Sequence, residues 1–181
     1  MRINEIVENA LLFLGDGDVK VTKQMEQDEK IKLLSKCANM IVKEIACKFL
    51  PLVAKQNVVT KNNAFAYDQL NNRVLEIVKI VELNSGISLD FVQTPDICKV
   101  IGAQNIEVTY KYIPRDGAID GECEISNKVL VKTVALGACA EYCIIQGLYQ
   151  QSVVFGQKYD EDIEWAKKSN KEIKIKPRRW F

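Results

Sequence analysis

The sequence predicts an α+β protein, a four-helix bundle with a small antiparallel β subdomain inserted between the second and third long helices. Apolar residues recur at helical spacing near both ends of the 181-residue chain. Between them the pattern changes to short β-branched and aromatic runs separated by turn residues. The predicted organisation is a helical bundle of residues 1–52 and 124–173, an inserted β subdomain with its connector at 53–123, and an extended basic and aromatic tail at 174–181.

The first two helices are predicted from their apolar stripes. Gly15 is expected to end the first helix as a left-handed cap, before a tight turn at 15–18 and a short extended piece at 19–21. The second helix is predicted from about residue 23 to residue 50, because Pro51 disfavours helix in the residue before it. The two stripes are Ile3, Ile6, Val7, Ala10, Leu11 and Leu14, and then Ile31, Leu34, Ala38, Ile41, Ile45 and Phe49.

The middle of the chain is predicted to be extended in short pieces, because β-branched and aromatic residues dominate them. In the last piece, Ile106, Val108 and Tyr110 alternate with more polar residues, as in a half-buried antiparallel strand. The turn Asn84-Ser85-Gly86 is expected to close a hairpin. The predicted strands are residues 57–60, 64–67, 73–83, 87–93, 98–101 and 105–113.

The last two helices are predicted over residues 126–148 and 149–173, and Ser126 is expected to cap the first of them. From residue 129 to 148 this helix is apolar on most sides, which predicts burial in a core or at a subunit contact. The other helix has a narrower stripe and a charged opposite face. That stripe is Tyr149, Ser152, Gly156, Tyr159, Ile163, Ala166, Asn170 and Ile173.

Composition argues against most catalytic sites. The chain has no histidine, which removes the commonest general base and the usual imidazole metal ligand. Its six cysteines form no Cys-x-x-Cys knuckle and are expected to be reduced, buried thiols, with a thiol enzyme using Cys139 or Cys143 as a minor alternative. Because 25 basic residues balance 24 acidic ones, no global attraction to nucleic acid or membrane is expected. No catalytic residue, cofactor or metal is predicted, and no signal peptide or membrane span, so a soluble cytoplasmic protein is expected.

The C-terminal tail is the most unusual part of the composition. Arginine and tryptophan often anchor protein interfaces, and Pro177 stiffens the approach, so the tail is predicted to bind a partner. A solvated charged end and phosphate contact through Arg178 and Arg179 are the alternatives. The predicted partner-binding residues are Ile175, Lys176, Arg178, Arg179, Trp180 and Phe181.

Three stretches and the order of elements together suggest a family. Residues 10–15 close the first helix, residues 134–149 are followed by Tyr159 and Trp165, and Arg178-Arg179-Trp180 ends the chain. In these features the chain resembles the head-to-tail adaptor proteins of short-tailed bacteriophages, also called tail-tubular or connector ring proteins.

The resemblance implies a structural, non-enzymatic subunit at the head–tail junction of a virion, assembled in the host bacterial cytoplasm. A ring of about twelve copies would dock under the portal protein, extend its DNA channel and meet the tail nozzle protein. Double-stranded DNA would pass without sequence recognition, and no membrane is implied. The tail would reach onto the portal, neighbouring subunits would pack through the helix bundle, and the β insertion would face outward or toward the next ring.

A small DNA-binding accessory protein is the alternative. In that case the cations of the tail would contact phosphates, and Trp180 would stack on a base.

Overall fold

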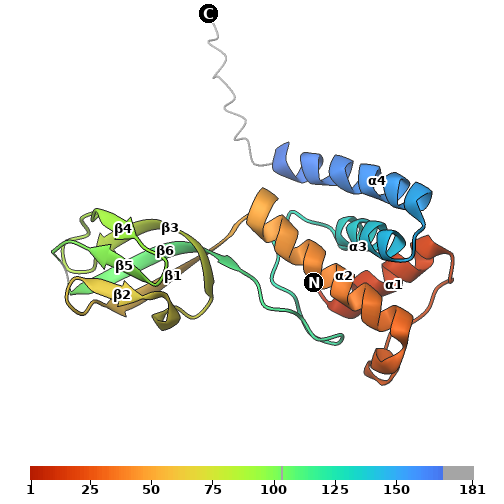
Figure 1. Ribbon diagram of the computed structural model, residues 1–181, viewed down its shortest axis with the longest axis horizontal. Coiled ribbons are helices and arrows are strands. Elements are labelled where there is room, and N and C mark those ends of the chain that lie inside the picture. Colours follow the sequence, from red (N-terminus) through yellow and green to blue (C-terminus); the bar gives the residue numbers. More distant parts are fainter. Residues whose placement is uncertain (103, 169–181) are drawn as a thin grey trace, which may run out of the picture. The chain divides into compact units, whose positions relative to one another are not determined.

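The computed structural model describes residues 1–102 and 104–168 and confirms the α+β class (Figure 1). The described residues form four α-helices, and six strands lie between the second and third of them in the sequence. The helices are α1 (Ile3–Leu14), α2 (Glu29–Glu44), α3 (Val131–Ile145) and α4 (Tyr149–Lys168).

The chain divides into two compact units. Residues 1–3 and 39–126 form what we call the β unit, and residues 4–38 together with those from 127 onward form the helical unit. The division falls within α2, so this helix contributes residues to both units.

The predicted end of α1 is confirmed. Gly15 has a φ of +90°, and the N–H of Asp16 donates to the carbonyl of Leu11 at 3.0 Å. The piece predicted to be extended at 19–21 lies outside the helices and strands, and the N–H of Val21 donates to the Glu8 carboxylate at 2.9 Å, which ties this segment to α1.

The prediction that the second helix is one continuous element was wrong. A 3₁₀-helix (Lys23–Gln27) comes first, and α2 then starts after Asp28, whose side chain accepts the N–H of Ile31 at 3.1 Å. This N-cap explains the break, because it satisfies a first-turn donor that a continuous helix would pair with its own backbone. The C-terminal end of the predicted helix is a π-helical turn (Ile45–Phe49) that follows α2. The N–H of Leu50 closes this turn by donating to the carbonyl of Ile45 at 2.8 Å.

The cap predicted at Ser126 was also wrong, because α3 begins five residues later, at Val131. Leu130 has extended backbone, and its carbonyl accepts the first helical N–H groups, from Thr133 and Val134. The turn into α4 is a Schellman motif centred on Gly147, at φ +74°. In this motif the N–H groups of Gly147 and Leu148 return to the carbonyls of Ile144 and Cys143.

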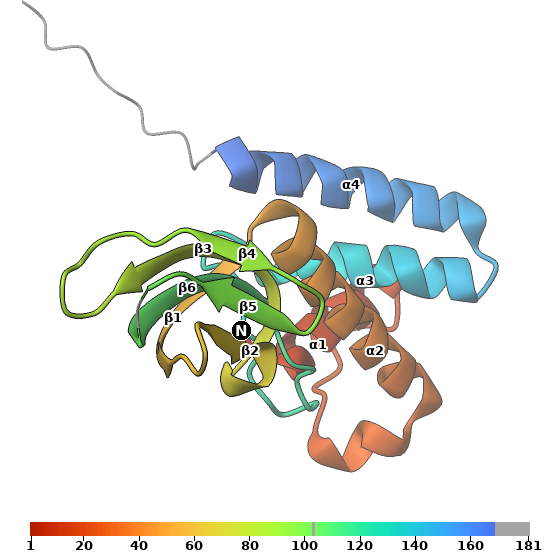
Figure 2. The same cartoon turned by 60° about the vertical axis from the view of Figure 1, so that its left-hand side comes forward.

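The helices α3 and α4 lie side by side and antiparallel in both views (Figure 1, Figure 2). Burial of the middle of α3 is confirmed, since every residue from Thr133 to Cys139 is buried. Of the predicted α4 stripe, Ser152, Tyr159 and Ile163 are buried. The stripe prediction was wrong at Tyr149, which is exposed, and its positions Asn170 and Ile173 lie outside the described residues.

The β unit contains two antiparallel three-stranded sheets. One has the order β1-β6-β3 and the other β2-β5-β4. Side chains from both sheets form one hydrophobic core, in which Tyr110 and Phe65 are the largest buried residues. The strands are β1 (Leu52–Val59), β2 (Ala64–Ala66), β3 (Arg73–Glu82), β4 (Phe91–Gln93), β5 (Ile97–Val100) and β6 (Asn105–Ile113).

The hairpin predicted at Asn84-Ser85-Gly86 is confirmed. Gly86 has a φ of +70°, and the N–H of Glu82 donates across the turn to the carbonyl of Ile87 at 2.9 Å. The strand predicted at 87–93 is shorter than expected. Ser88 forms only an isolated bridge with Val81 of β3, flanked by the bond from the N–H of Leu89 to the carbonyl of Ile80 at 2.9 Å, and Phe91–Gln93 then pairs with β5.

Candidate functional site

The partner-binding residues predicted in the tail lie outside the described residues. They are Ile175, Lys176, Arg178, Arg179, Trp180 and Phe181. The described residues that stand out as candidates for binding are instead exposed apolar side chains of the helical unit.

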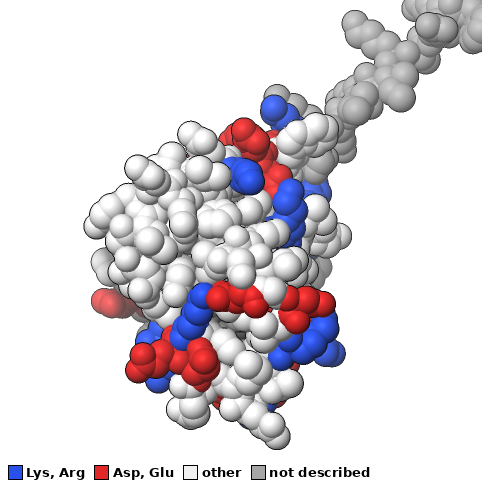
Figure 3. Space-filling model, turned by 90° about the vertical axis from the view of Figure 1, so that its right-hand side faces the viewer, with Lys and Arg blue, Asp and Glu red and all other residues white. Residues whose placement is uncertain are grey.

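The first group lies where α3 turns into α4. No residue from 142 to 157 is charged, although this segment covers the end of one helix and the start of the next. Figure 3 views the molecule from this end of the hairpin, and much of the middle of that face lacks acidic and basic side chains. We call the exposed apolar residues of this segment the turn surface. They are Ile144, Ile145, Leu148, Tyr149, Val153 and Val154.

Local geometry explains why these side chains gather. The left-handed conformation of Gly147 reverses the chain within two residues, so the last turn of α3 and the first turns of α4 share one end of the hairpin. Tyr149 and Val153 are four positions apart and therefore lie on the same face of α4. The side chain of Tyr149 is 68% exposed. Beside them, Val154 and Phe155 line a shallow hollow of about 250 Å³ with two glutamine side chains, Gln150 and Gln151.

The turn surface is comparable in area to the largest apolar patch of a typical monomer. The exposed parts of its six side chains together have an apolar area on the order of 500 Å². The largest apolar patch on a typical monomer has an area of ~300–600 Å². Neutral glutamine side chains surround it, which matches the depletion of charge at the centre of protein interfaces. The arrangement is suited to binding another protein.

The second group lies at the opposite end of the same hairpin, where α3 begins and α4 approaches its C-terminus. Leu130 is 64% exposed and Trp165 is 76% exposed. They line a hollow of about 450 Å³ together with Lys128, Thr133, Asp162 and Ala166. We call these six residues the end surface.

The end surface is held in place by polar contacts between α3 and α4. The hydroxyl of Thr133 donates to the Asp162 carboxylate at 3.2 Å, and Lys132 lies 3.8 Å from the same carboxylate. Trp165 also lines an adjoining hollow, together with Asp160, Asp162, Glu161, Glu164 and Lys168. The end surface therefore combines an exposed indole with charged side chains of both signs.

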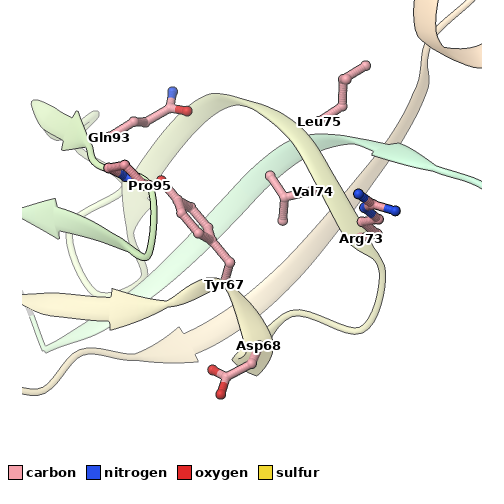
Figure 4. Close-up of a pocket in the computed structure, with 7 residues that line it drawn as sticks. All are labelled: Tyr67, Asp68, Arg73, Val74, Leu75, Gln93 and Pro95. Carbon is pink, nitrogen blue, oxygen red and sulfur yellow. The ribbon is translucent and has the colours of Figure 1, made fainter.

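The β unit has a hollow of about 430 Å³ between its 3₁₀-helix (Tyr67–Gln69), β3 and the end of β4. Tyr67 points toward Pro95 and donates to the carbonyl of Thr94 at 2.9 Å, whereas the Asp68 carboxylate points the other way (Figure 4). Because these polar groups do not converge, the hollow lacks the arrangement that orients a small ligand.

The cysteines are buried, apart from the half-buried Cys47. Burial raises the pKa of the Cys139 thiol to about 12 and that of the Cys37 thiol to about 11, against a usual value of 9.0. Burial also raises the pKa of Cys143. These shifts oppose formation of the reactive thiolate that a thiol enzyme needs. Among the described residues, no group of three or more Cys, Asp or Glu side chains could hold a metal ion.

Sequence reasoning missed the exposure of both surfaces. The uncharged run at 142–157 was a visible signal, but an apolar helix is compatible with a core as well as with a contact. Trp165 was a clearer signal, because it falls on the charged face of α4, outside the predicted apolar stripe.

Comparison with other proteins adds no identification, since the sequence matches no protein-family model and no curated protein. In the part of the chain that the structure describes, no helix is long and apolar enough to cross a membrane.

Proposed function

We propose that this protein is a structural subunit of a phage head-to-tail connector, which assembles into a ring, docks under the portal, extends the DNA channel and attaches the tail. One observation carries the proposal: a large, charge-free apolar surface is exposed on the helical unit. A subunit that assembles with other proteins requires an exposed apolar surface of this kind, and the depletion of charge is typical of the centre of a protein interface.

The order of elements supports the same function. Two helices, a β insertion and two further helices follow one another in the chain, as in the adaptor proteins that the sequence resembles. The tail at 174–181 would reach the portal, and the portal contact would be led by Trp180 and Phe181.

Native mass spectrometry tests the proposal, first on the protein alone and then on the protein mixed with the portal protein of the same virus. We expect a complex in which a defined number of copies joins one portal ring. A protein that ignores the portal under all conditions would contradict the connector function. Binding to double-stranded DNA that weakens steeply with salt would then favour the accessory DNA-binding protein, because each neutralised phosphate adds to the salt dependence.

A further inference from the structure

We propose that Asp16 is a site of spontaneous isomerisation to isoaspartate, formed by reaction of its side-chain carboxyl group with the backbone nitrogen of Gly17. The inference does not depend on the connector function, because it rests on the turn that follows α1.

The reaction requires an aspartyl carboxyl group and an accessible backbone nitrogen in the next residue. This nitrogen attacks the side-chain carbonyl carbon. The nitrogen gives up its proton and the carboxyl group gives up an oxygen, which leave together as water, and a five-membered succinimide ring remains. Water then opens the ring at either carbonyl carbon, so that aspartate or isoaspartate of the same mass results. Glycine in the second position favours the attack, because it has no side chain to shield the nitrogen.

The chain has three Asp-Gly pairs, at residues 16–17, 116–117 and 120–121. In the last two the glycine N–H is hydrogen-bonded. Gly117 donates to the side-chain oxygen of Asn39 at 2.9 Å, and Gly121 donates to the carbonyl of Ala118 at 2.9 Å. Such a bond must break before the nitrogen can lose its proton and attack, so the fold protects these two pairs.

The pair Asp16-Gly17 has no such protection. Within the part of the chain that the structure describes, the N–H of Gly17 has no hydrogen-bond partner, although its carbonyl accepts the N–H of Val19 at 3.1 Å. Asp16 and Gly17 are both exposed and lie outside the helices and strands. Gly17 has a φ of +86°, and a Cβ added there would meet no atom within 4 Å, so the space beside its backbone is open.

Ion pairs do not explain the difference between the sites. The carboxylate of Asp16 lies 2.5 Å from Nζ of Lys30, and the carboxylate of Asp116 lies 2.6 Å from Nζ of Lys43. Each carboxylate therefore has a lysine partner. The two sites differ in the hydrogen bond of the glycine that follows.

Isomerisation would remove the ion pair between Asp16 and Lys30. In isoaspartate the main chain runs through Cβ, and the free carboxylate is attached directly to Cα, so its reach is one carbon shorter. Lys30 also lies 5.7 Å from the centre of the Tyr142 ring, and this contact does not involve Asp16. The modification would thus release the turn after α1 from α2 within the helical unit.

The test keeps the folded, full-length protein at neutral pH and physiological temperature and follows isoaspartate with time. Trypsin cuts after lysine and arginine, so the unprotected pair falls in peptide 3–20 and both protected pairs in peptide 116–128. An isoaspartyl methyltransferase with S-adenosylmethionine labels the modified peptides, and electron-transfer fragmentation assigns the residue. Deamidation of asparagine is distinguished because it changes the peptide mass.

We expect isoaspartate at Asp16, and accumulation that is roughly fivefold or more slower at Asp116 and Asp120, as a hydrogen bond to each glycine N–H implies. In urea these bonds are lost, so the three pairs should react at similar rates. Asp16→Glu is the site control, because its longer side chain would have to close a six-membered ring. This variant should form no isoaspartate at position 16.

Asn39→Ala tests the protecting bond itself. The substitution removes the acceptor of the Gly117 N–H, so isoaspartate at Asp116 should rise toward the rate at Asp16, while Gly121 keeps its bond to Ala118. Circular dichroism shows whether this variant is folded. If it is not, the comparison of the folded and the urea-unfolded unaltered protein decides.

Two outcomes would overturn the inference. One is equal accumulation of isoaspartate at the three pairs in the folded protein. The other is a folded protein in which Asp16 stays unmodified while the urea-unfolded chain reacts there. Neither outcome bears on portal binding, which native mass spectrometry measures separately.

Discussion

Gly117 shows how tightly the connector after β6 fits against the N-terminus within the β unit. A Cβ atom at this position would lie 2.8 Å from Cγ1 of Ile3, which is fully buried. Asn39 fixes the same residue, because its side-chain amide accepts the N–H of Gly117 at 2.9 Å and donates to its carbonyl at 3.1 Å. A methyl group at this position would therefore require the buried Ile3 side chain or the hydrogen-bonded Gly117 backbone to shift.

We therefore expect Gly117→Ala to lower the free energy of unfolding by about 1–3 kcal/mol through overpacking. Gly156→Ala is the matched control, since a Cβ at this position in α4 would meet no atom within 4 Å. The control should raise the free energy of unfolding by about 0.5–1 kcal/mol, because alanine restricts the unfolded chain and favours helix. Urea unfolding measures both. Equal effects of the two substitutions would show that Ile3 yields to the new methyl group.

The buried thiols predict a loss of stability in alkaline solution. Burial raises the pKa of Cys37 to about 11 and that of Cys139 to about 12, so the folded protein keeps both thiols protonated while the unfolded chain ionises them near its usual pKa of 9.0. Their contribution is complete below pH 9 and is lost as the pH rises toward 11–12. Between pH 9 and pH 10 each thiol should remove about 1 kcal/mol from the free energy of unfolding.

Urea midpoints at pH 8, 9 and 10 test this, with Cys139→Ala as the comparison. The variant should be less stable at pH 8 but should lose less stability than the unaltered protein at higher pH. If the urea midpoints of the two proteins fell in parallel as the pH rises, Cys139 would ionise in the folded state as readily as in the unfolded chain.

At the scale of elements, the sequence predicted what local patterns determine. The stripe and glycine cap of α1 and the turn at Asn84-Ser85-Gly86 all depend on neighbouring residues, and all three are confirmed. The start of α3 was missed, because a serine signals a cap only if the chain after it is helical. Here the backbone remains non-helical until Leu130. Exposure of the turn surface could not be predicted, since it depends on whether another element covers the residues, not on their apolar character.

Gln56 illustrates how one side chain joins elements of the β unit. From β1 its amide donates to the carbonyl of Gln69 and accepts the N–H of Asn71, each at 2.8 Å. Its oxygen also accepts the hydroxyl of the buried Tyr110 in β6 at 3.4 Å. It thereby fixes the link between the 3₁₀-helix at Tyr67–Gln69 and β3.

Gln56→Leu should lower the free energy of unfolding by about 1–3 kcal/mol, because three groups lose their partner. Hydrogen exchange should accelerate at the Asn71 amide more than in the ladder between β1 and β6. The control is Lys55→Gln, which removes an exposed ion pair with Glu107 and should change stability by less than about 1 kcal/mol. Unchanged protection at Asn71 would show that Gln56 does not hold the link.

At the scale of the whole molecule, the proposed function divides assembly into two contacts. In this proposal, contacts between copies would use exposed apolar surfaces of the helical unit, and the portal contact would use the tail that the sequence predicts to bind a partner. If the two contacts are independent, loss of one should leave the other measurable. This separation allows each contact to be tested on the full assembly.

Deleting residues 174–181 should therefore abolish binding to the portal while leaving the melting temperature and the self-association of the protein unchanged. The physical reason is that these residues lie outside the apolar patterns that predict the core. A drop of many degrees in melting temperature would mean that the tail packs on its own chain.

A second variant, Arg178→Gln with Arg179→Gln, keeps Trp180 and Phe181 and separates charge from apolar contact. If the aromatic residues lead the docking, this variant should still bind the portal, and the affinity of the unaltered protein should fall only modestly between 50 mM and 200 mM salt. Phosphate binding should instead weaken roughly tenfold or more over the same range, in proportion to the phosphates contacted, and it should be nearly lost in the double variant.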